Sequence, residues 1–220
     1  MLISHSKRFI YLKTRKTGGT SVEIYFERYC LNPAAPYEER HHRDPEISEW
    51  GVVGSRGYVD QTWFNHMHAS RVRELVGERR WGEYFKFCVV RNPFDKVVSQ
   101  FWYELSPSLR EKMQHVDFAT VREDFAEWTK LLRFPTDQWI YTIDGVVVVD
   151  RFIHYEKLLE QMAEVCGHLD IAWQPEQLGA YKSEHRARSE PYFSYHTPET
   201  MARVRMKYAW ELEFFGYSCN

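Results

Sequence analysis

Short apolar runs of strand length recur along the chain and end at polar turns. The first covers residues 9–12 ("FIYL"), the second residues 84–90 ("YFKFCVV"), and later runs lie at 146–149 and 152–153. Aromatic and β-branched residues favour strands, and nearly continuous apolar runs are typical of strands buried on both faces. These runs therefore predict the strands of a central sheet.

Helical spacing of apolar residues follows the first two runs. After the first, one helix face is formed by residues at i, i+3, i+4 and i+7, namely Val22, Tyr25, Phe26 and Tyr29. After the second, Asn92 can cap a helix and Pro93 suits its first position. Further helices are predicted over residues 70–80, 118–132, 156–168 and 197–213.

Strands that alternate with helices predict an α/β fold with a mainly parallel sheet, formed as one domain over residues 1–220. Residues 32–60 and 180–195 are polar and are expected to be loops, with 41–44 solvated. In parallel sheets ligands bind beyond the carboxyl ends of the strands. The turns at 13–21 and 91–93 follow predicted strands, so we expect them to face one ligand.

Composition narrows the classes of function. A formal net charge of −2 argues against a dedicated nucleic-acid-binding protein. The N-terminal segment lacks a long apolar stretch and no run is as long as a membrane span, so we expect a cytoplasmic protein. The four cysteines lack C-x-x-C spacing, which predicts neither a zinc site nor a disulfide framework, and no other metal-ligand cluster is evident. The oligomeric state stays open.

The first turn, "KTRKTGGTS", has the composition of an anion-binding loop. Glycines allow backbone N–H groups to approach an anion, and a helix start adds a favourable dipole. Lys16 supplies positive charge before Gly18 and Gly19, and hydroxyl groups flank them on both sides. The order differs from the Walker motif, in which the lysine follows the glycines. The alternative is a lysine-rich surface turn with a glycine hinge.

The second turn adds a candidate for another anion. Arg91 at a strand end can donate two hydrogen bonds to one oxyanion. Ser99 lies two helical turns later and off the apolar stripe, so it can face the same pocket. A structural cap is the alternative for both residues. Two anion sites at one sheet edge suggest a ligand with two phosphate-like groups.

Together, the two segments resemble the signature segments of sulfotransferases that use 3′-phosphoadenosine 5′-phosphosulfate (PAPS). "KTRKTGGTS" is similar to the loop for the 5′-phosphosulfate end, and "FKFCVVRNPFDKVVSQF" to the R-N-P-x-D-x-x-x-S segment for the 3′-phosphate. "VDRFIHYEKL" and "EPYFSYHTPETMARVRMKYAWELEFFGY" extend the resemblance to carbohydrate-type and bacterial members. It implies a three-layer α/β sandwich with a P-loop-like sulfotransferase fold.

The resemblance also assigns residues. It gives the 5′ end of PAPS to the first loop, that is, to Lys16, Thr17, Gly18, Gly19, Thr20 and Ser21. It gives the 3′-phosphate to Arg91 and Ser99. Family members often fold a late basic loop over the nucleotide, so Arg186 in "YKSEHRARSE" is a further candidate, with a solvent-exposed loop as the alternative.

Sulfuryl transfer to an alcohol needs a cation beside the leaving oxygen. Like phosphoryl transfer, it depends mainly on positioning and electrostatic stabilisation. Lys16 is the natural candidate, whereas Lys13 and Arg15 are expected to point to solvent.

The acceptor hydroxyl also needs a base. His66 and His68 in "FNHMHAS" alternate on a segment that we expect to be extended, so both would face one cleft. The pair is similar to the H-x-H of uronyl 2-O-sulfotransferases, which favours His68 as base and His66 as helper. Glu23 or Asp95 is the competing base, and Glu23 could equally lie on the helix surface.

The leading hypothesis is therefore O-sulfation of a sugar, glycolipid or small metabolite by a PAPS-dependent enzyme. A P-loop kinase-like phosphotransferase is an alternative, although the chain lacks a Walker lysine and an evident Walker-B acidic residue. A non-catalytic nucleotide- or glycan-binding module is another. The acceptor itself is not identified by any pattern in the chain.

Overall fold

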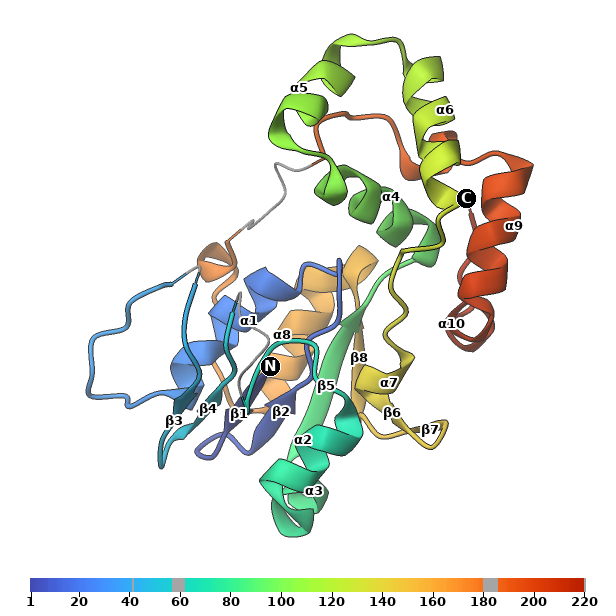
Figure 1. Cartoon of the computed structure of the whole chain (residues 1–220). Coiled ribbons are helices and arrows are strands. Elements are labelled where there is room, and N and C mark those ends of the chain that lie inside the picture. The colour runs from blue at the N-terminus through green and yellow to red at the C-terminus, as the bar shows by residue number, and fades with distance from the viewer. Residues whose placement is uncertain (41, 57–61, 180–185, 220) are drawn as a thin grey trace. The chain divides into compact units, whose positions relative to one another are not determined.

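The computed structural model describes residues 1–40, 42–56, 62–179 and 186–219. The chain divides into two compact units. The first comprises Met1–Val90 and Asp137–Tyr181, and the second comprises Arg91–Thr136 and Lys182–Asn220. All strands of the described residues lie in the first unit, and the second is helical (Figure 1).

The first unit is built on a sheet whose described strands run in the order β3-β4-β1-β2-β5-β8. Their bounds are Glu46–Ile47 (β3), Gly51–Val53 (β4), Leu2–Ser4 (β1), Phe9–Tyr11 (β2), Phe85–Val90 (β5) and Arg151–His154 (β8). β2, β5 and β8 are parallel neighbours, whereas β1, β3 and β4 pair antiparallel. Tyr11 at the end of β2 pairs with Phe87, so the first turn begins beside β5.

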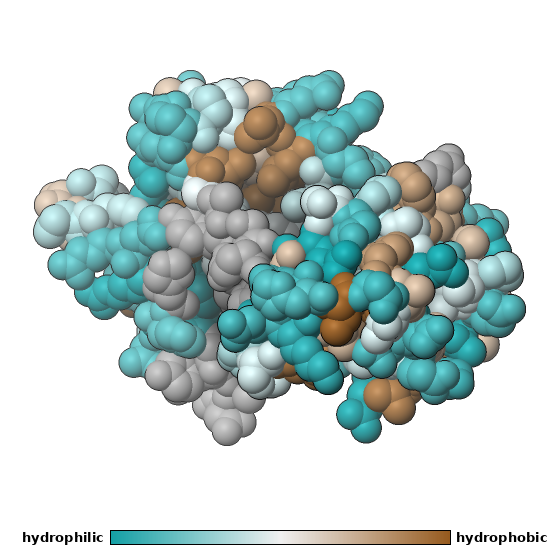
Figure 2. Space-filling model, turned by 90° about the horizontal axis from the view of Figure 1, so that it is seen from above, coloured by the Kyte–Doolittle hydropathy of each residue, from teal (hydrophilic) through white to brown (hydrophobic). Residues whose placement is uncertain are grey.

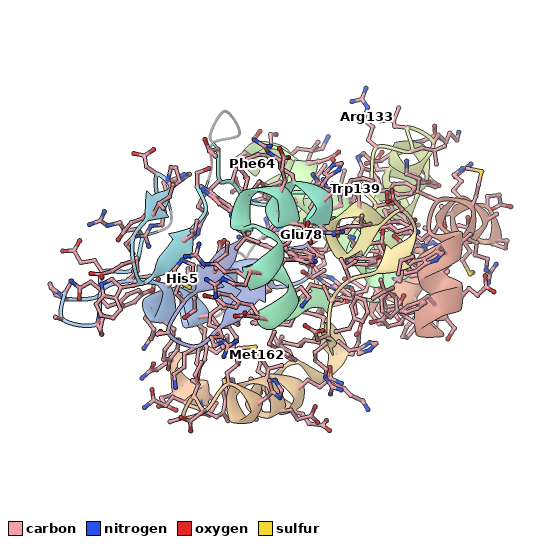
Figure 3. The ribbon with its side chains drawn as sticks, turned by 90° about the horizontal axis from the view of Figure 1, so that it is seen from below. His5, Phe64, Glu78, Arg133, Trp139 and Met162 are labelled. Atoms are coloured by element: carbon pink, nitrogen blue, oxygen red, sulfur yellow. The ribbon has the colours of Figure 1, made fainter. Side chains whose placement is uncertain are left out.

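Helices cover both faces of this sheet. α1 (Gly19–Glu27) and α8 (Leu158–His168) pack on one face, where Phe9, Phe87 and Ile153 belong to the same buried cluster as residues of both helices. α2 (Ala69–Val76), α3 (Glu78–Glu83) and α7 (Gln138–Tyr141) lie on the opposite side from α8 (Figure 3). The remaining elements are the hairpin β6 and β7 (Thr142–Ile143 and Val146–Val147) and the single turns Arg28–Cys30, Tyr155–Lys157 and Pro175–Gln177.

The second unit consists of helices around an aromatic core. Its helices are α4 (Pro93–Glu104), α5 (Pro107–His115), α6 (Phe118–Thr129), α9 (Pro198–Lys207) and α10 (Ala209–Phe215), with a single turn at Tyr192–Tyr195. Phe101, Trp102 and Phe125 are in the buried cluster between them. Asn92 accepts a hydrogen bond from the Phe94 N–H at 3.0 Å, which confirms the predicted cap of α4.

The face seen from above is largely hydrophilic, and its apolar residues gather in a few patches (Figure 2). Scattered exposed apolar residues are normal for a globular protein. Within the described ranges, no helix combines the length and the apolar character needed to cross a membrane.

The predicted α/β class is confirmed, with changes in detail. The sheet is mixed because β1, β3 and β4, which the apolar runs did not predict, add antiparallel pairs. The helix predicted over 70–80 is broken at Gly77, whose φ of 82° is left-handed. The helix predicted over 197–213 breaks at Tyr208. α5 was not predicted either.

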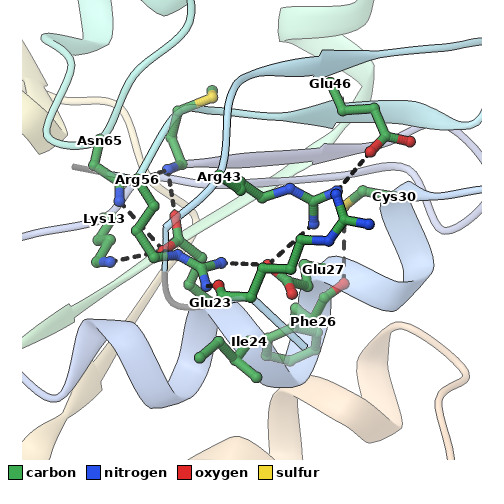
Figure 4. Close-up of polar contacts among 12 residues, drawn as sticks. Lys13, Glu23, Ile24, Phe26, Glu27, Cys30, Arg43, Glu46, Arg56 and Asn65 are labelled. Carbon is green, nitrogen blue, oxygen red and sulfur yellow. Dashed lines mark hydrogen bonds and ion pairs between the residues drawn. The ribbon is translucent and has the colours of Figure 1, made fainter. Parts of the chain in front are cut away.

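A buried ion network holds α1 against the start of the first turn (Figure 4). Glu23 and Glu27 of α1 are both 0% exposed. Lys13 Nζ lies 2.7 Å from Glu23 Oε2, and Arg56 Nε lies 2.9 Å from the same oxygen. Arg56 also pairs with Glu27, and Arg43 lies 3.6 Å from Glu27.

This network corrects three expectations. Lys13 does not point to solvent, Arg43 is not in a solvated loop, and Glu23 is not on the helix surface. Burial alone would raise the pKa of Glu23, but Lys13, the Met1 amine and Arg56 hold it below its ordinary value. Glu23 is therefore a buried structural carboxylate and is not available as the base.

Glu23→Gln should lower the free energy of unfolding by about 3–5 kcal/mol, because breaking one side of a buried pair leaves uncompensated charge. Urea denaturation followed by tryptophan fluorescence measures this. Glu74→Gln is the control, since Glu74 pairs with Arg71 on an exposed surface and such pairs contribute about 0–1 kcal/mol. Equal effects of the two variants would contradict a central role for the network.

Candidate functional site

The first turn is fixed between the ends of β2 and β5. The Thr14 hydroxyl hydrogen-bonds to the Val89 carbonyl of β5, and its Oγ1 lies 2.8 Å from Thr17 Oγ1. The backbone then turns sharply, because Lys16 has a φ of 59° and Gly18 a φ of 72°. A positive φ is uncommon outside glycine, so Lys16 is held in a conformation that the surrounding loop imposes.

Both glycine positions are crowded, and Gly18 also has a positive φ. A Cβ on Gly18 would lie 3.0 Å from the Tyr155 ring, and a Cβ on Gly19 would lie 3.1 Å from the Tyr11 hydroxyl oxygen. α1 begins at Gly19, with Thr20 and Ser21 buried in its first turn. Two glycine positions at a helix start leave backbone N–H groups accessible. Flanked by hydroxyl groups and a lysine, they are suited to binding an oxyanion.

Asp137 anchors the loop from a distant segment. The Arg15 N–H donates to Asp137 Oδ2 at 2.9 Å, and the Arg15 guanidinium lies 3.6 Å from Asp137 Oδ1. The guanidinium also lies 5.7 Å from the centre of the Trp139 ring, within cation–π range. The expectation that Arg15 points to solvent is therefore wrong. Its positive charge is balanced by Asp137, which is 2% exposed.

His66 is bound directly to the loop. Its Nδ1 lies 3.0 Å from the Lys13 carbonyl oxygen, which can only accept, so Nδ1–H donates. In the neutral ring Nε2 is then without a proton. Burial, reinforced by Lys13 and Arg15, lowers the pKa of His66 to about 3. The φ of 64° shows that the segment is not extended at His66, so the geometric reason for pairing it with His68 was wrong.

His68 is connected to the same loop through Trp139. It precedes α2 as the N-cap residue and is exposed. Its ring stacks on Trp139, with centroids 5.5 Å apart and an interplanar angle of 30°. Trp139 also contacts Arg15 of the loop. The first unit thus gathers the loop, His66 and His68, although not by the alternation that the sequence suggested.

The second unit brings together Arg91 and Arg186. Arg91 Nη2 lies 2.7 Å from Asp95 Oδ2, and Arg186 Nη1 lies 3.0 Å from Asp95 Oδ1. Both oxygens of Asp95 are thus engaged by guanidinium groups, which argues against Asp95 as the base. Ser99 is half-buried on α4. Of the late basic loop, residues 182–185 lie outside the described residues.

Asp137, which anchors the loop, was not predicted. It has no motif and lies more than a hundred positions from the loop, so the sequence gives no signal for it. The pairing of Asp95 with Arg91 had a local signal, because Arg91 lies just before α4 and Asp95 lies in its first turn. Among the residues in the described ranges, no group of three or more His, Cys, Asp or Glu is arranged to hold a metal.

His66 should remain neutral, with its proton on Nδ1, from pH 8 down to about pH 4, because its pKa is lowered to about 3. In the unfolded chain an ordinary histidine has a pKa near 6.5, so the unfolded state binds this proton at a higher pH than the folded state does. Protonation of His66 therefore lowers the free energy of unfolding as the pH falls below 6.5. Long-range ¹H–¹⁵N NMR, with His66→Gln for assignment, measures the titration. A midpoint near 6.5 would contradict this burial.

Comparison with known proteins assigns the chain to a family. The model of the family described as "Sulfotransferase family" matches residues 1–218. Carbohydrate sulfotransferase 10 of Gallus gallus is 24% identical over 177 residues, which cover 64% of this chain and 48% of that protein. The chain thus spans about half the length of this curated relative. No solved structure matches. Because the family match runs through both turns and nearly the whole sequence, this chain belongs to the sulfotransferase family.

Proposed function

We propose that this chain transfers a sulfuryl group from PAPS to a hydroxyl group of a carbohydrate or a related small molecule. The observation that carries the proposal is the family match over residues 1–218, which includes both anion-binding motifs. The name of the matched relative favours a sugar acceptor over other hydroxyl compounds.

The residues of the first turn fit the 5′ end of such a donor. The loop carries the positive charge of Lys16, the Thr17 hydroxyl, which lies 2.8 Å from Thr14 Oγ1, and two glycine positions at which a Cβ would be crowded. Thr20 and Ser21 add hydroxyl groups at the start of α1, so the assigned loop resembles a P-loop. Arg91 and Ser99, joined by Arg186, are assigned to the 3′-phosphate because guanidinium groups match phosphate oxygens.

The donor supplies an activated sulfuryl group whose departure leaves negative charge on a phosphate oxygen. Lys16 stabilises that charge, in the way that preorganised cations stabilise transferred phosphoryl groups. His68 accepts the proton of the acceptor hydroxyl. Its exposed ring is accessible to an acceptor, and its stacking on Trp139 keeps it near the loop.

His66 is the weaker candidate for the base. A base must hold the proton that it takes, and a pKa of about 3 makes the protonated ring of His66 unfavourable. Its Nδ1–H is committed to the Lys13 carbonyl, which leaves Nε2 as a fixed hydrogen-bond acceptor. We assign His66 to orienting the acceptor hydroxyl, and His68 to proton removal.

Wild-type protein should bind 3′-phosphoadenosine 5′-phosphate (PAP) without magnesium, as measured by isothermal titration calorimetry. Arg91→Ala and Lys16→Ala should each weaken binding by about 10- to 100-fold, since each removes charged hydrogen bonds. Arg71→Ala is the control, because Arg71 is an exposed surface residue paired with Glu74. Binding of ATP with magnesium, but not of PAP, would replace this proposal with the kinase-like one.

His68→Ala should lower kcat by about 10²- to 10⁴-fold, the usual contribution of a general base, with little change in PAP affinity. PAP release from PAPS in the presence of a sugar panel measures this. His42→Ala, in an exposed loop position, is the control. If His66→Gln abolishes turnover while His68→Ala does not, the roles of the two histidines are reversed. PAP binding without turnover on any acceptor would favour a binding module.

A further inference from the structure

Asp95 lies between two cations of the second unit. Arg91 donates to Asp95 Oδ2 from Nε at 2.8 Å and from Nη2 at 2.7 Å, while Arg186 Nη1 donates to Oδ1 at 3.0 Å. The side chains of Arg91 and Asp95 are 9% and 12% exposed, and that of Arg186 is 25% exposed. One carboxylate is therefore divided between two guanidinium groups, one oxygen to each.

The arrangement differs from an ordinary pair on a helix surface. Exposed pairs at i and i+4 contribute little, because both side chains remain mobile and hydrated. Here Arg186 comes from a segment 91 positions away and is held at two more points. Its Nη2 donates to the Glu190 carbonyl at 2.7 Å, and its guanidinium carbon lies 5.7 Å from the centre of the Tyr195 ring.

Charge and geometry give Asp95 a specific effect on the two arginines. Two guanidinium groups drawn together repel each other, and the carboxylate between them offsets one of the two positive charges. The guanidinium is planar with donors in fixed directions, so a bond to Asp95 also sets the direction of its remaining donors. A phosphomonoester dianion would meet two oriented cations without the entropic cost of arranging them.

We propose that Asp95 is a positioning residue for the 3′-phosphate of the donor, acting through Arg91 and Arg186. The inference rests on the proposed function, which assigns those two arginines to that phosphate. Asp95 itself does not contact the phosphate, since like charges repel. Its contribution is to hold both guanidinium groups in one arrangement before the nucleotide binds.

Two nucleotides separate this role from a general structural one. PAP carries the 3′-phosphate, whereas adenosine 5′-phosphosulfate lacks it, and both are titrated calorimetrically into wild type, Asp95→Asn and Asp95→Glu. Asp95→Asn keeps the size of the side chain and removes its charge. It should weaken PAP binding by about 10- to 100-fold, the range for a charged hydrogen-bond network, and change 5′-phosphosulfate binding less than about twofold. Asp95→Glu should restore part of the PAP affinity.

Glu111→Gln is the matched control, because it makes the same charge change at an exposed position of α5 in the same unit. It should leave both affinities unchanged, and thermal melts verify that each variant is folded. Tighter PAP binding by Asp95→Asn would show that Asp95 repels the phosphate and would overturn the inference. Equal losses for both nucleotides, or no loss, would also overturn it. A wild type that binds neither nucleotide would instead overturn the proposed function, and the inference with it.

Discussion

The ion pair between Lys13 and Glu23 is the constraint on which the candidate site depends. Glu23 lies in α1 and Lys13 at the start of the first turn, so their 2.7 Å contact joins the strand side of the loop to its helix side. The Lys13 carbonyl in turn accepts the hydrogen bond of His66. Loop and histidine are therefore anchored at the same residue, Lys13, which is buried.

Three carboxylates each pair with particular basic residues in or beside the two motifs and so fix where those residues lie. Glu23 takes Lys13 into the core, Asp137 holds Arg15 beside Trp139, and Asp95 joins Arg91 to Arg186. Each of these carboxylates is buried, so the loss of its partner would leave an uncompensated buried charge. Burial and partners, rather than residue type, thus distinguish basic residues that are adjacent in the sequence.

The sequence predicted the elements in which periodicity is strong. The apolar runs at 9–12, 84–90 and 152–153 predicted β2, β5 and β8, and the stripes after the first two predicted α1 and α4. The run at 146–149 was wrongly placed in the central sheet, because Val146–Val147 forms β7 of a separate hairpin. β1, β3 and β4 were not predicted, because no apolar run like that of residues 9–12 marks these short strands off from the polar residues around them. Their pairing is decided by the neighbouring strands, which a local pattern does not contain.

The loop residues of the candidate site were predictable from the sequence, but the residues that hold them in place were not. A local motif was enough to single out Lys16 and Gly18, because a glycine beside a lysine is a typical composition for an anion-binding loop. The environment of His66 required the fold, since its left-handed backbone and its bond to Lys13 depend on a segment 53 positions away. The same holds for Trp139, which contacts His68 only through tertiary structure.

Following the sulfuryl group itself shows directly whether this chain transfers it to a sugar. The wild-type protein is incubated with PAPS carrying a radiolabelled sulfuryl group and a mixture of oligosaccharides, and the label is traced by chromatography. We expect label on a sugar hydroxyl, PAP released in equal amount, and loss of both in Lys16→Ala. Label that stays on the nucleotide with every sugar, in protein that binds PAPS, would contradict it.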